Sequence, residues 1–148
     1  MIKIGVVLKD FGPSQLAYEF LSQTNKLLRE RFDIAPYGFF ENLGKPVISP
    51  NFSLMNLTEA YGFDGILITT SAYQTFQTIN YPGPKRHIFY SYDLDFLSQK
   101  GQAEFYFQCY RNTESWTRNQ VYSDLVKNNF NIESKVNPDF NLESFING

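Results

Sequence analysis

The stretch GFDGILITTSAYQTFQTINYPGPKRHIFYSYDLD, residues 62–95, decides the fold of this chain. It predicts a buried strand over Gly65–Thr70, a short helix over Ala72–Ile79, a Pro/Gly turn and a second buried strand over Arg86–Tyr92. Both strands are short β-branched or aromatic runs, typical of central strands covered on both faces. Each run ends in polar residues, and open α/β sheets bind ligands beyond the carboxyl ends of their strands. We therefore expect any functional site to involve these two strand ends.

The same alternation of strands and helices precedes this stretch. Pro36 lies inside one predicted strand and favours an edge position or an irregular strand there, because proline cannot donate to a sheet ladder. The elements expected before residue 62 are strand Ile2–Leu8, helix Gln15–Arg31 capped by Ser14, strand Asp33–Phe39, a brief strand at Val47-Ile48, and helix Leu54–Tyr61 capped by Ser53.

After residue 95 the pattern continues less clearly. The segment NTESWT, residues 112–117, occupies the place of a strand but is unusually polar for one. The other elements expected are helix Gln102–Tyr110, helix Asn119–Asn129 and a short strand within Ile132–Val136. Together the elements predict one doubly wound, Rossmann-like α/β domain over residues 1–137, with a mostly parallel sheet and helices on both faces. Residues 138–148 are expected to be a linker or a tail that packs on the surface.

Composition narrows the function classes. The 148 residues carry a formal net charge of −2, and the 13 Lys and Arg residues are scattered singly, which argues against a nucleic-acid partner. The N-terminal apolar run is too short for a signal peptide and no membrane span is apparent, so we expect a cytoplasmic protein without a membrane partner. Aromatic residues make up 18%, which fits either core filler or a stacking pocket or protein interface.

The chain has one cysteine, Cys109, and one histidine, His87. These counts exclude a disulfide framework and a Cys- or His-pair metal site. Cys109 lies in an apolar helical stretch and is expected to be a small core residue. His87 opens a buried strand, where we expect it to satisfy a hydrogen bond. No metal and no cofactor is predicted.

The loop after the first strand, KDFGP, supplies the first candidate residues. It lacks the GxGxxG dinucleotide fingerprint, and it also lacks GxxxxGK[ST], which excludes a Walker-type phosphate cradle. Phe11, Gly12 and Ser14 are candidates for ligand binding at a helix N-terminus, and a plain turn with a serine cap is the alternative. Asp10 is the candidate catalytic base, and the alternative is a solvated loop aspartate.

The two central strand ends supply the other candidates. Thr70 and Ser71 offer hydroxyls to sugar or phosphate oxygens, and Ser71 also suits a helix cap. Asp93 and Asp95 form a D-x-D, a pattern that can hold a divalent cation bridging a diphosphate, or that can merely cap a turn. The remaining candidates for ligand binding are Tyr92, at the end of the second strand, and Trp116, whose ring can stack on a sugar, anchor an interface or lie in the core.

The succession GFDG, ILITTSAYQTFQTINYPGPKRHIFY and Tyr92–Leu97 (YDLDFL) resembles the N-terminal half of GT-B type glycosyltransferases, particularly phage-encoded ones. In that family a strand after a Pro-containing turn ends in a Tyr/Trp–Asp–Leu–acid–aromatic–Leu pattern. Residues 115–140 resemble the following helix and the lead into the interdomain linker. The resemblance covers most of the chain.

The resemblance implies a glycosyltransferase-like domain without the C-terminal, donor-binding half of the family. The expected function is binding of an acceptor or another sugar or nucleotide-sugar ligand, or completion of a site by a second polypeptide. Complete activity alone is not expected, because transfer requires both reactants held in line. A phage origin would place the protein in the host cytoplasm. Two alternatives stay open: an interaction module that forms a homo-oligomer or binds a host protein, and a small metal-dependent transferase that uses Asp93 and Asp95.

Overall fold

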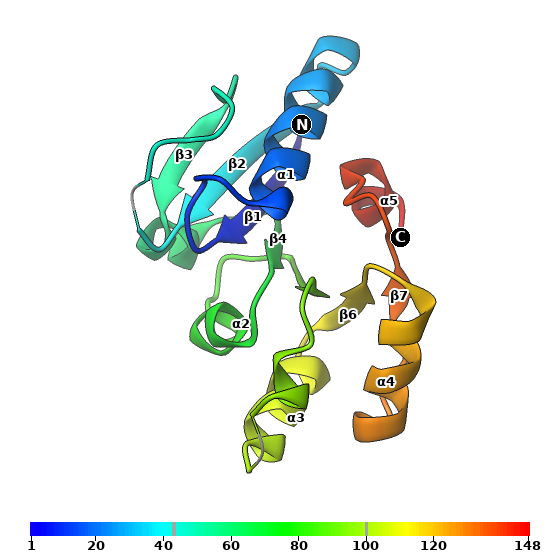
Figure 1. The fold of residues 1–148 in the computed structure, drawn as a ribbon. Coiled ribbons are helices and arrows are strands. Elements are labelled where there is room, and N and C mark those ends of the chain that lie inside the picture. The colour runs from blue at the N-terminus through cyan, green and yellow to red at the C-terminus, as the bar shows by residue number, and fades with distance from the viewer. Residues whose placement is uncertain (43, 100) are drawn as a thin grey trace.

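The computed structural model describes residues 1–42, 44–99 and 101–148 and contains a parallel sheet wrapped by helices (Figure 1). Within these residues, seven strands form one all-parallel sheet in the order β3-β2-β1-β4-β5-β6-β7. The strands are β1 (Ile2–Leu8), β2 (Ile34–Phe40), β3 (Ser53–Asn56), β4 (Ile66–Thr69), β5 (Arg86–Ser91), β6 (Glu114–Thr117) and β7 (Lys135–Val136). The helices are α1 (Gln15–Glu30), α2 (Ala72–Thr78), α3 (Ala103–Arg111), α4 (Gln120–Phe130) and α5 (Leu142–Asn147), with 3-10 turns η1 (Leu57–Gly62) and η2 (Asp95–Leu97). The doubly wound α/β prediction is confirmed.

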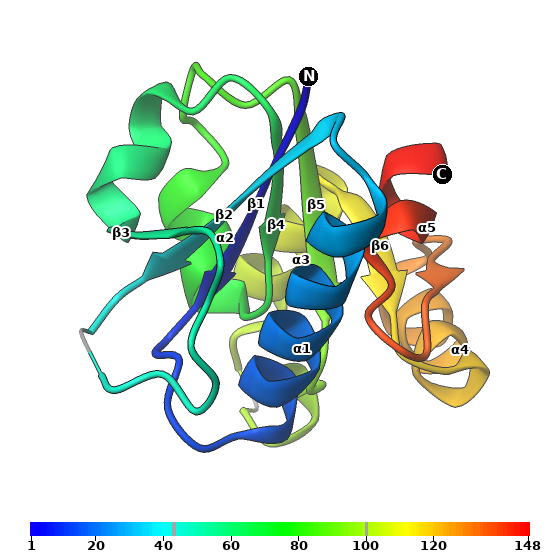
Figure 2. The same ribbon diagram turned by 90° about the horizontal axis from the view of Figure 1, so that it is seen from above.

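The helices form two layers, one on each face of the sheet. Helices α1 and α5 lie on one face, and α2, α3 and α4 lie on the other (Figure 1). In the view from above, α1 and α5 lie in front of the strands (Figure 2). Strand β1 serves both layers, because side chains alternate across a strand: Ile4, Val6 and Leu8 join the α1 core cluster and Val7 joins the opposite one.

Three helices begin at residues whose side chains cap the first turn, and such capping residues can be recognised in the sequence. The Ser14 side chain accepts a hydrogen bond from the backbone N–H of Ala17 and caps α1. Ser71 caps α2 in the same way through Gln74, as Asn119 does for α4. Each cap satisfies a backbone donor that has no partner inside its helix, so these three boundaries agree with the sequence to within a residue.

The region before residue 62 differs from the prediction. Residues 53–56 are not the start of a helix but form β3, which pairs in parallel with Tyr37–Phe40. Asn56, rather than Ser53, then caps the 3-10 turn η1. The brief strand predicted at Val47-Ile48 is not formed. Instead, the backbone N–H of Val47 donates a hydrogen bond to the backbone carbonyl of Phe11. Pairing with β2, a contact distant in sequence, overrides the local helical pattern.

Strand β2 is an interior strand, so the edge position inferred from Pro36 is wrong. It pairs with β1 along its whole length, with Pro36 opposite Ile4. Its pairing with β3 begins only at Tyr37. The proline therefore lies just before the second ladder starts, where a missing N–H costs no bond to β3.

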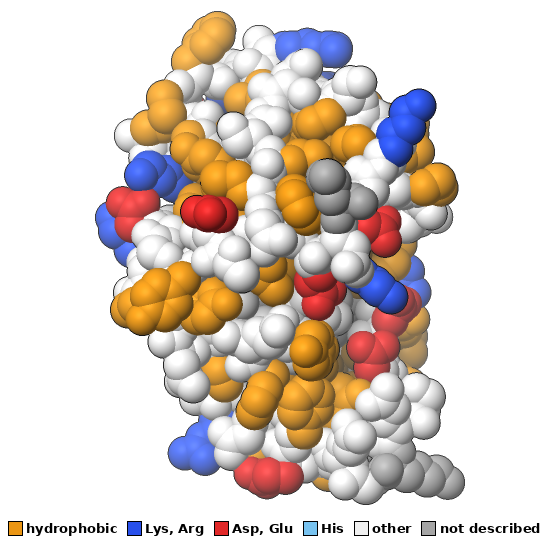
Figure 3. Space-filling view, turned by 90° about the vertical axis from the view of Figure 1, so that its left-hand side faces the viewer, with side chains coloured by type: hydrophobic (Ala, Val, Ile, Leu, Met, Phe, Trp, Pro, Cys, Tyr) orange, Lys and Arg blue, Asp and Glu red, His pale blue; other side chains and the backbone are white. Residues whose placement is uncertain are grey.

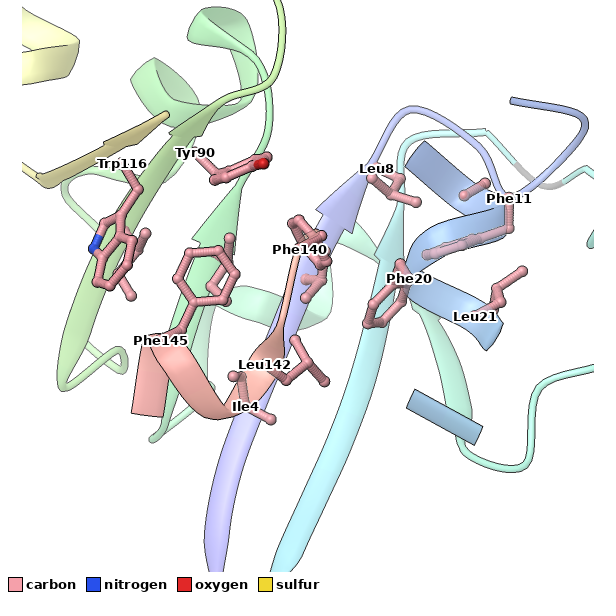
Figure 4. Packing of buried hydrophobic residues seen from close by; sticks show 14 of the residues in the cluster. Ile4, Leu8, Phe11, Phe20, Leu21, Tyr90, Trp116, Phe140, Leu142 and Phe145 are labelled. Carbon is pink, nitrogen blue, oxygen red and sulfur yellow. The ribbon is translucent and has the colours of Figure 1, made fainter. Parts of the chain in front are cut away.

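The final residues contribute to the core, whereas the sequence predicts a linker or a tail that packs on the surface. Phe140, Leu142 and Phe145 are buried, and their side chains turn toward Tyr90 and the α1 core (Figure 4). The rings of Phe140 and Phe145 lie 5.1 and 5.6 Å from that of Tyr90, both edge-on. The polar segment 112–117 is likewise ordered, since its residues Glu114–Thr117 form β6.

Candidate functional site

The chain turns in opposite directions from its two central strands. From β1 it crosses through α1 to β2, and from β4 it crosses through α2, on the other face, to β5. The carboxyl ends of β1 and β4 therefore lie at a topological switch point, where open α/β sheets leave a crevice. A cleft of about 650 Å³ occupies this place. Its lining in the described chain is Leu8, Lys9, Asp10, Pro13, Ser14, Gln15, Leu16, Glu41, Thr70, Ser71, Tyr73, Gln74, Tyr92 and Asp93.

One wall of the cleft is the loop that follows β1. The Asp10 carboxylate accepts a hydrogen bond from the backbone N–H of Gly12 at 2.9 Å, which folds the loop back on itself. Ser14 lines the cleft while its hydroxyl caps α1. The second carboxylate oxygen of Asp10 is not needed for the turn, so this wall can accept hydrogen bonds from a ligand.

The floor of the cleft is a hydrogen-bonded chain that joins three strands. The Thr70 hydroxyl donates to the Val7 carbonyl at 2.7 Å, and the Thr70 N–H donates to Gln74 Oε1 at 3.1 Å. The Gln74 amide nitrogen then donates to Glu41 Oε2 at 3.2 Å. Because Gln74 is buried, this network fixes the Glu41 carboxylate at the cleft.

The opposite wall follows β5. Tyr92 and Asp93 line the cleft, and Arg118, the residue after β6, lies behind them with its guanidinium carbon 4.5 Å from the centre of the Tyr92 ring. Burial, and next the charge of Glu19, raises the pKa of the Tyr92 hydroxyl. Tyr73, on α2, is 61% exposed and adds a second ring to the cleft.

Six of the predicted site residues meet at this cleft. They are Asp10, Ser14, Thr70, Ser71, Tyr92 and Asp93. Four others do not line it. Phe11 is 1% exposed and packs on Phe20, and Gly12 serves the Asp10 turn. Trp116 faces α5, with its ring centre 5.0 Å from that of Phe145.

Asp95 belongs to the turn η2, not to the cleft. Burial, and next the charge of Asp93, raises the pKa of its carboxyl. Within the described ranges, no group of three or more His, Cys, Asp or Glu residues is placed to hold a metal ion. The D-x-D pair therefore supplies one cleft residue and one turn residue.

The structure adds cleft residues that the sequence reasoning missed. Glu41, Lys9, Tyr73 and Gln74 all line the cleft. Glu41 directly follows β2 and lies two residues after the predicted strand Asp33–Phe39, so the rule that selected Asp10, two residues after Leu8, also points to Glu41. The charged side chains that line the cleft are the three carboxylates of Asp10, Glu41 and Asp93 and the ammonium of Lys9.

The single histidine and cysteine lie away from this chemistry. Burial lowers the pKa of His87 to about 4, and its Nε2 lies 3.2 Å from the Thr78 hydroxyl. Burial raises the pKa of the Cys109 thiol to about 11, and its Sγ donates to the Ala72 carbonyl. The sequence-based roles of a core thiol and a hydrogen-bonded imidazole are confirmed.

The fold and the cleft define a doubly wound α/β protein with a polar, mainly acidic crevice at its switch point. Comparison of the chain with protein-family models, with curated proteins and with solved structures gave no match. In the described residues, none of the helices has the length and apolar character needed to cross a membrane.

Proposed function

We propose that this chain is a glycosyltransferase-like domain of the GT-B N-terminal type that binds an acceptor sugar in the β1–β4 cleft. The observation that carries the proposal is the cleft itself: carboxylates of Asp10 and Glu41 at one end and the rings of Tyr73 and Tyr92 beside them. Carboxylates accept hydrogen bonds from sugar hydroxyls, and exposed aromatic rings stack on the apolar face of a sugar.

The charge of the lining favours the acceptor over the donor. Asp10 and Glu41 would repel a diphosphate placed at their end of the cleft, and Lys9 is the only cation among the lining residues that the structure describes. A neutral hydroxyl group meets no such penalty. The donor would then be bound outside this cleft, with Asp10 as the base that takes the proton from the acceptor hydroxyl.

The proposal is tested by titrating the isotope-labelled chain with neutral glycosides and, separately, with nucleotide sugars, and following backbone amide resonances by NMR. We expect saturable shifts at the residues that line the cleft with a neutral glycoside. The double variant Asp10→Asn, Glu41→Gln should weaken this binding about tenfold or more, because hydrogen bonds to charged groups contribute roughly 1.5–3 kcal/mol each.

After Asp10→Asn the side-chain oxygen would still accept the hydrogen bond from the Gly12 N–H, and after Glu41→Gln it would still accept the one from the Gln74 amide nitrogen. The cleft should therefore stay folded in the double variant. The matched control is Glu30→Gln. Glu30 is exposed at the C-terminal end of α1, near the amino ends of the strands and so away from the cleft. The proposal fails if no neutral glycoside produces saturable shifts, or if the control weakens binding as much as the double variant does.

A second candidate is the interaction module on a recycled transferase fold. Tyr73 and Phe76 project from α2, and their side chains are 61% and 50% exposed. The ring centre of Phe76 lies 5.1 Å from that of Phe105 on α3. The face that carries β3 and α2 shows several separate groups of hydrophobic side chains among charges of both signs (Figure 3). Light scattering on the chain and on Phe76→Ser tests this candidate, which requires a mass above 17.2 kDa that the substitution lowers.

A further inference from the structure

Arg118 is held beside the cleft by two tyrosine rings. Its guanidinium carbon lies 4.5 Å from the centre of the Tyr92 ring and 5.0 Å from that of Tyr122. One terminal nitrogen donates to the Tyr122 hydroxyl at 2.9 Å. Stacking and this bond fix the plane of the cation, so the position of its charge is set before any ligand arrives.

The guanidinium has more donors than the protein satisfies. An arginine carries five N–H donors, and the Tyr122 hydroxyl is the one hydrogen-bond acceptor that the described chain gives Arg118. Its Nε is buried without a partner. The Asp93 carboxylate lies 3.7 Å from Nη2, too long for a hydrogen bond, and the Asp93 side chain is 73% exposed. The attraction between this exposed pair is weak and screened by water.

The cleft is therefore polar along its length. Asp10 and Glu41, after β1 and β2, place negative charge at one end, and Arg118, after β6, places positive charge behind Tyr92 and Asp93 at the other. A ligand with hydroxyls at one end and an oxyanion at the other matches this arrangement. A doubly charged phosphate, or a carboxylate that can pair with two nitrogens at once, attracts a guanidinium more strongly than a single oxygen at 3.7 Å.

We infer that Arg118 binds an oxyanion, a phosphate or a carboxylate, carried by the sugar that occupies the cleft. Asp93, which lines the cleft, occupies the place of this group when no ligand is bound and is displaced by it. The inference rests on the proposed function, which gives the ligand as a sugar. It narrows the ligand to acidic sugars. Arg118 is a binding residue in this scheme, and the structure gives it no chemical step.

The test follows the side-chain Nε–Hε resonance of Arg118 by NMR while the chain is titrated with glucose 1-phosphate, glucuronate, methyl glucoside and inorganic phosphate. We expect the two acidic sugars to shift this resonance saturably and to bind several-fold more tightly than methyl glucoside. Inorganic phosphate should shift it more weakly, because it lacks the sugar contacts. Glucose 1-phosphate and glucuronate distinguish a phosphate from a carboxylate preference.

Three variants assign the effect. Arg118→Gln should lower the affinity for the acidic sugars to that for methyl glucoside. Asp93→Asn should raise the affinity for the acidic sugars several-fold relative to the affinity for methyl glucoside, since it removes the competing charge. The matched control Arg29→Gln, exposed near the C-terminal end of α1, should change neither.

Arg118→Gln is expected to lower the affinity for acidic sugars and Asp93→Asn to raise it, so misfolding of the variants cannot explain both results. Asp93→Asn cannot tighten binding by destabilising the protein. The inference is overturned if acidic and neutral sugars bind equally, or if Asp93→Asn leaves the acidic sugars unaffected. If methyl glucoside still shifts the cleft resonances, the proposed function survives that result. If no sugar shifts them, both fail.

Discussion

At the scale of the residue, the buried imidazole of His87 links folding to pH. The Thr78 hydroxyl donates to the Gln74 carbonyl, so its oxygen can accept from the Nε2–H of a neutral His87 ring. Burial lowers the imidazole pKa from 6.5 to about 4. Between these two pH values the unfolded chain binds a proton that the folded chain does not, so the free energy of unfolding falls as the pH drops through this window.

We expect the free energy of unfolding to fall by about 2 kcal/mol between pH 7 and pH 5 from His87 alone. Urea melts at the two pH values measure the change. The variant His87→Gln lacks the titration and should lose most of this difference. The chain has one histidine, so its ring resonances follow the same protonation directly, and a midpoint near 6.5 in the folded protein would contradict the argument.

The candidate site was predictable at the residues that directly follow clear strands. Asp10, Thr70 and Tyr92 lie at or just after the ends of the predicted strands Ile2–Leu8, Gly65–Thr70 and Arg86–Tyr92, and each lines the cleft. Glu41 and Arg118 follow strands that Pro36 and the polar segment 112–117 obscure. Trp116 shows the converse error: within β6 it pairs with Tyr90 and faces the same core, so alternation along the strand, not polar neighbours, decides its burial.

At the scale of the element, predictions that rest on local sequence signals are correct, and those that depend on contacts distant in sequence are not. Helices α1, α2 and α4 were predictable because caps and periodicity are local properties. Strand β3 was not, because four residues hold too short a pattern to separate a strand from a helical turn, and its pairing with Tyr37–Phe40 is a distant contact. The sheet order depends on crossovers between such strands, so the sequence predicted its class but not its register.

Two neighbouring glycines test how closely β4 packs on β1. A Cβ at Gly65 would lie 2.4 Å from the backbone oxygen of Lys3, whereas a Cβ at Gly62 would meet nothing within 4 Å. Gly65→Ala must therefore move backbone at the start of the β1–β4 ladder. We expect it to lower the free energy of unfolding by about 1–3 kcal/mol, as overpacking does.

Gly62→Ala is the matched control for this prediction. It introduces the same methyl group at the end of η1 and should be neutral or stabilising by about 0.4–1 kcal/mol, because alanine restricts the unfolded chain. Thermal melts of the two variants beside the parent chain give the comparison. Equal destabilisation by both substitutions would mean that the loss at Gly65 does not arise from the contact with Lys3.

At the scale of the whole molecule, the two ends of the chain complete one face of the sheet. Helix α1 covers the β1 and β2 side of this face, and residues 138–148 cover the β5 and β6 side, where Tyr90 and Trp116 lie. The opposite face is covered by α2, α3 and α4. Without the final segment, those two large aromatic side chains would be exposed to water.

The final segment should therefore contribute to global stability. Phe145 is fully buried and contacts Tyr90, Trp116 and Phe140 through its ring, so Phe145→Ala should lower the free energy of unfolding by about 3–5 kcal/mol. Phe32, 86% exposed, is the matched control, and Phe32→Ala should change it by less than about 0.5 kcal/mol. Denaturant melts followed by far-UV circular dichroism measure both, and a loss at Phe145 no larger than that at Phe32 would show that residues 138–148 are an appendage to a core that is complete without them.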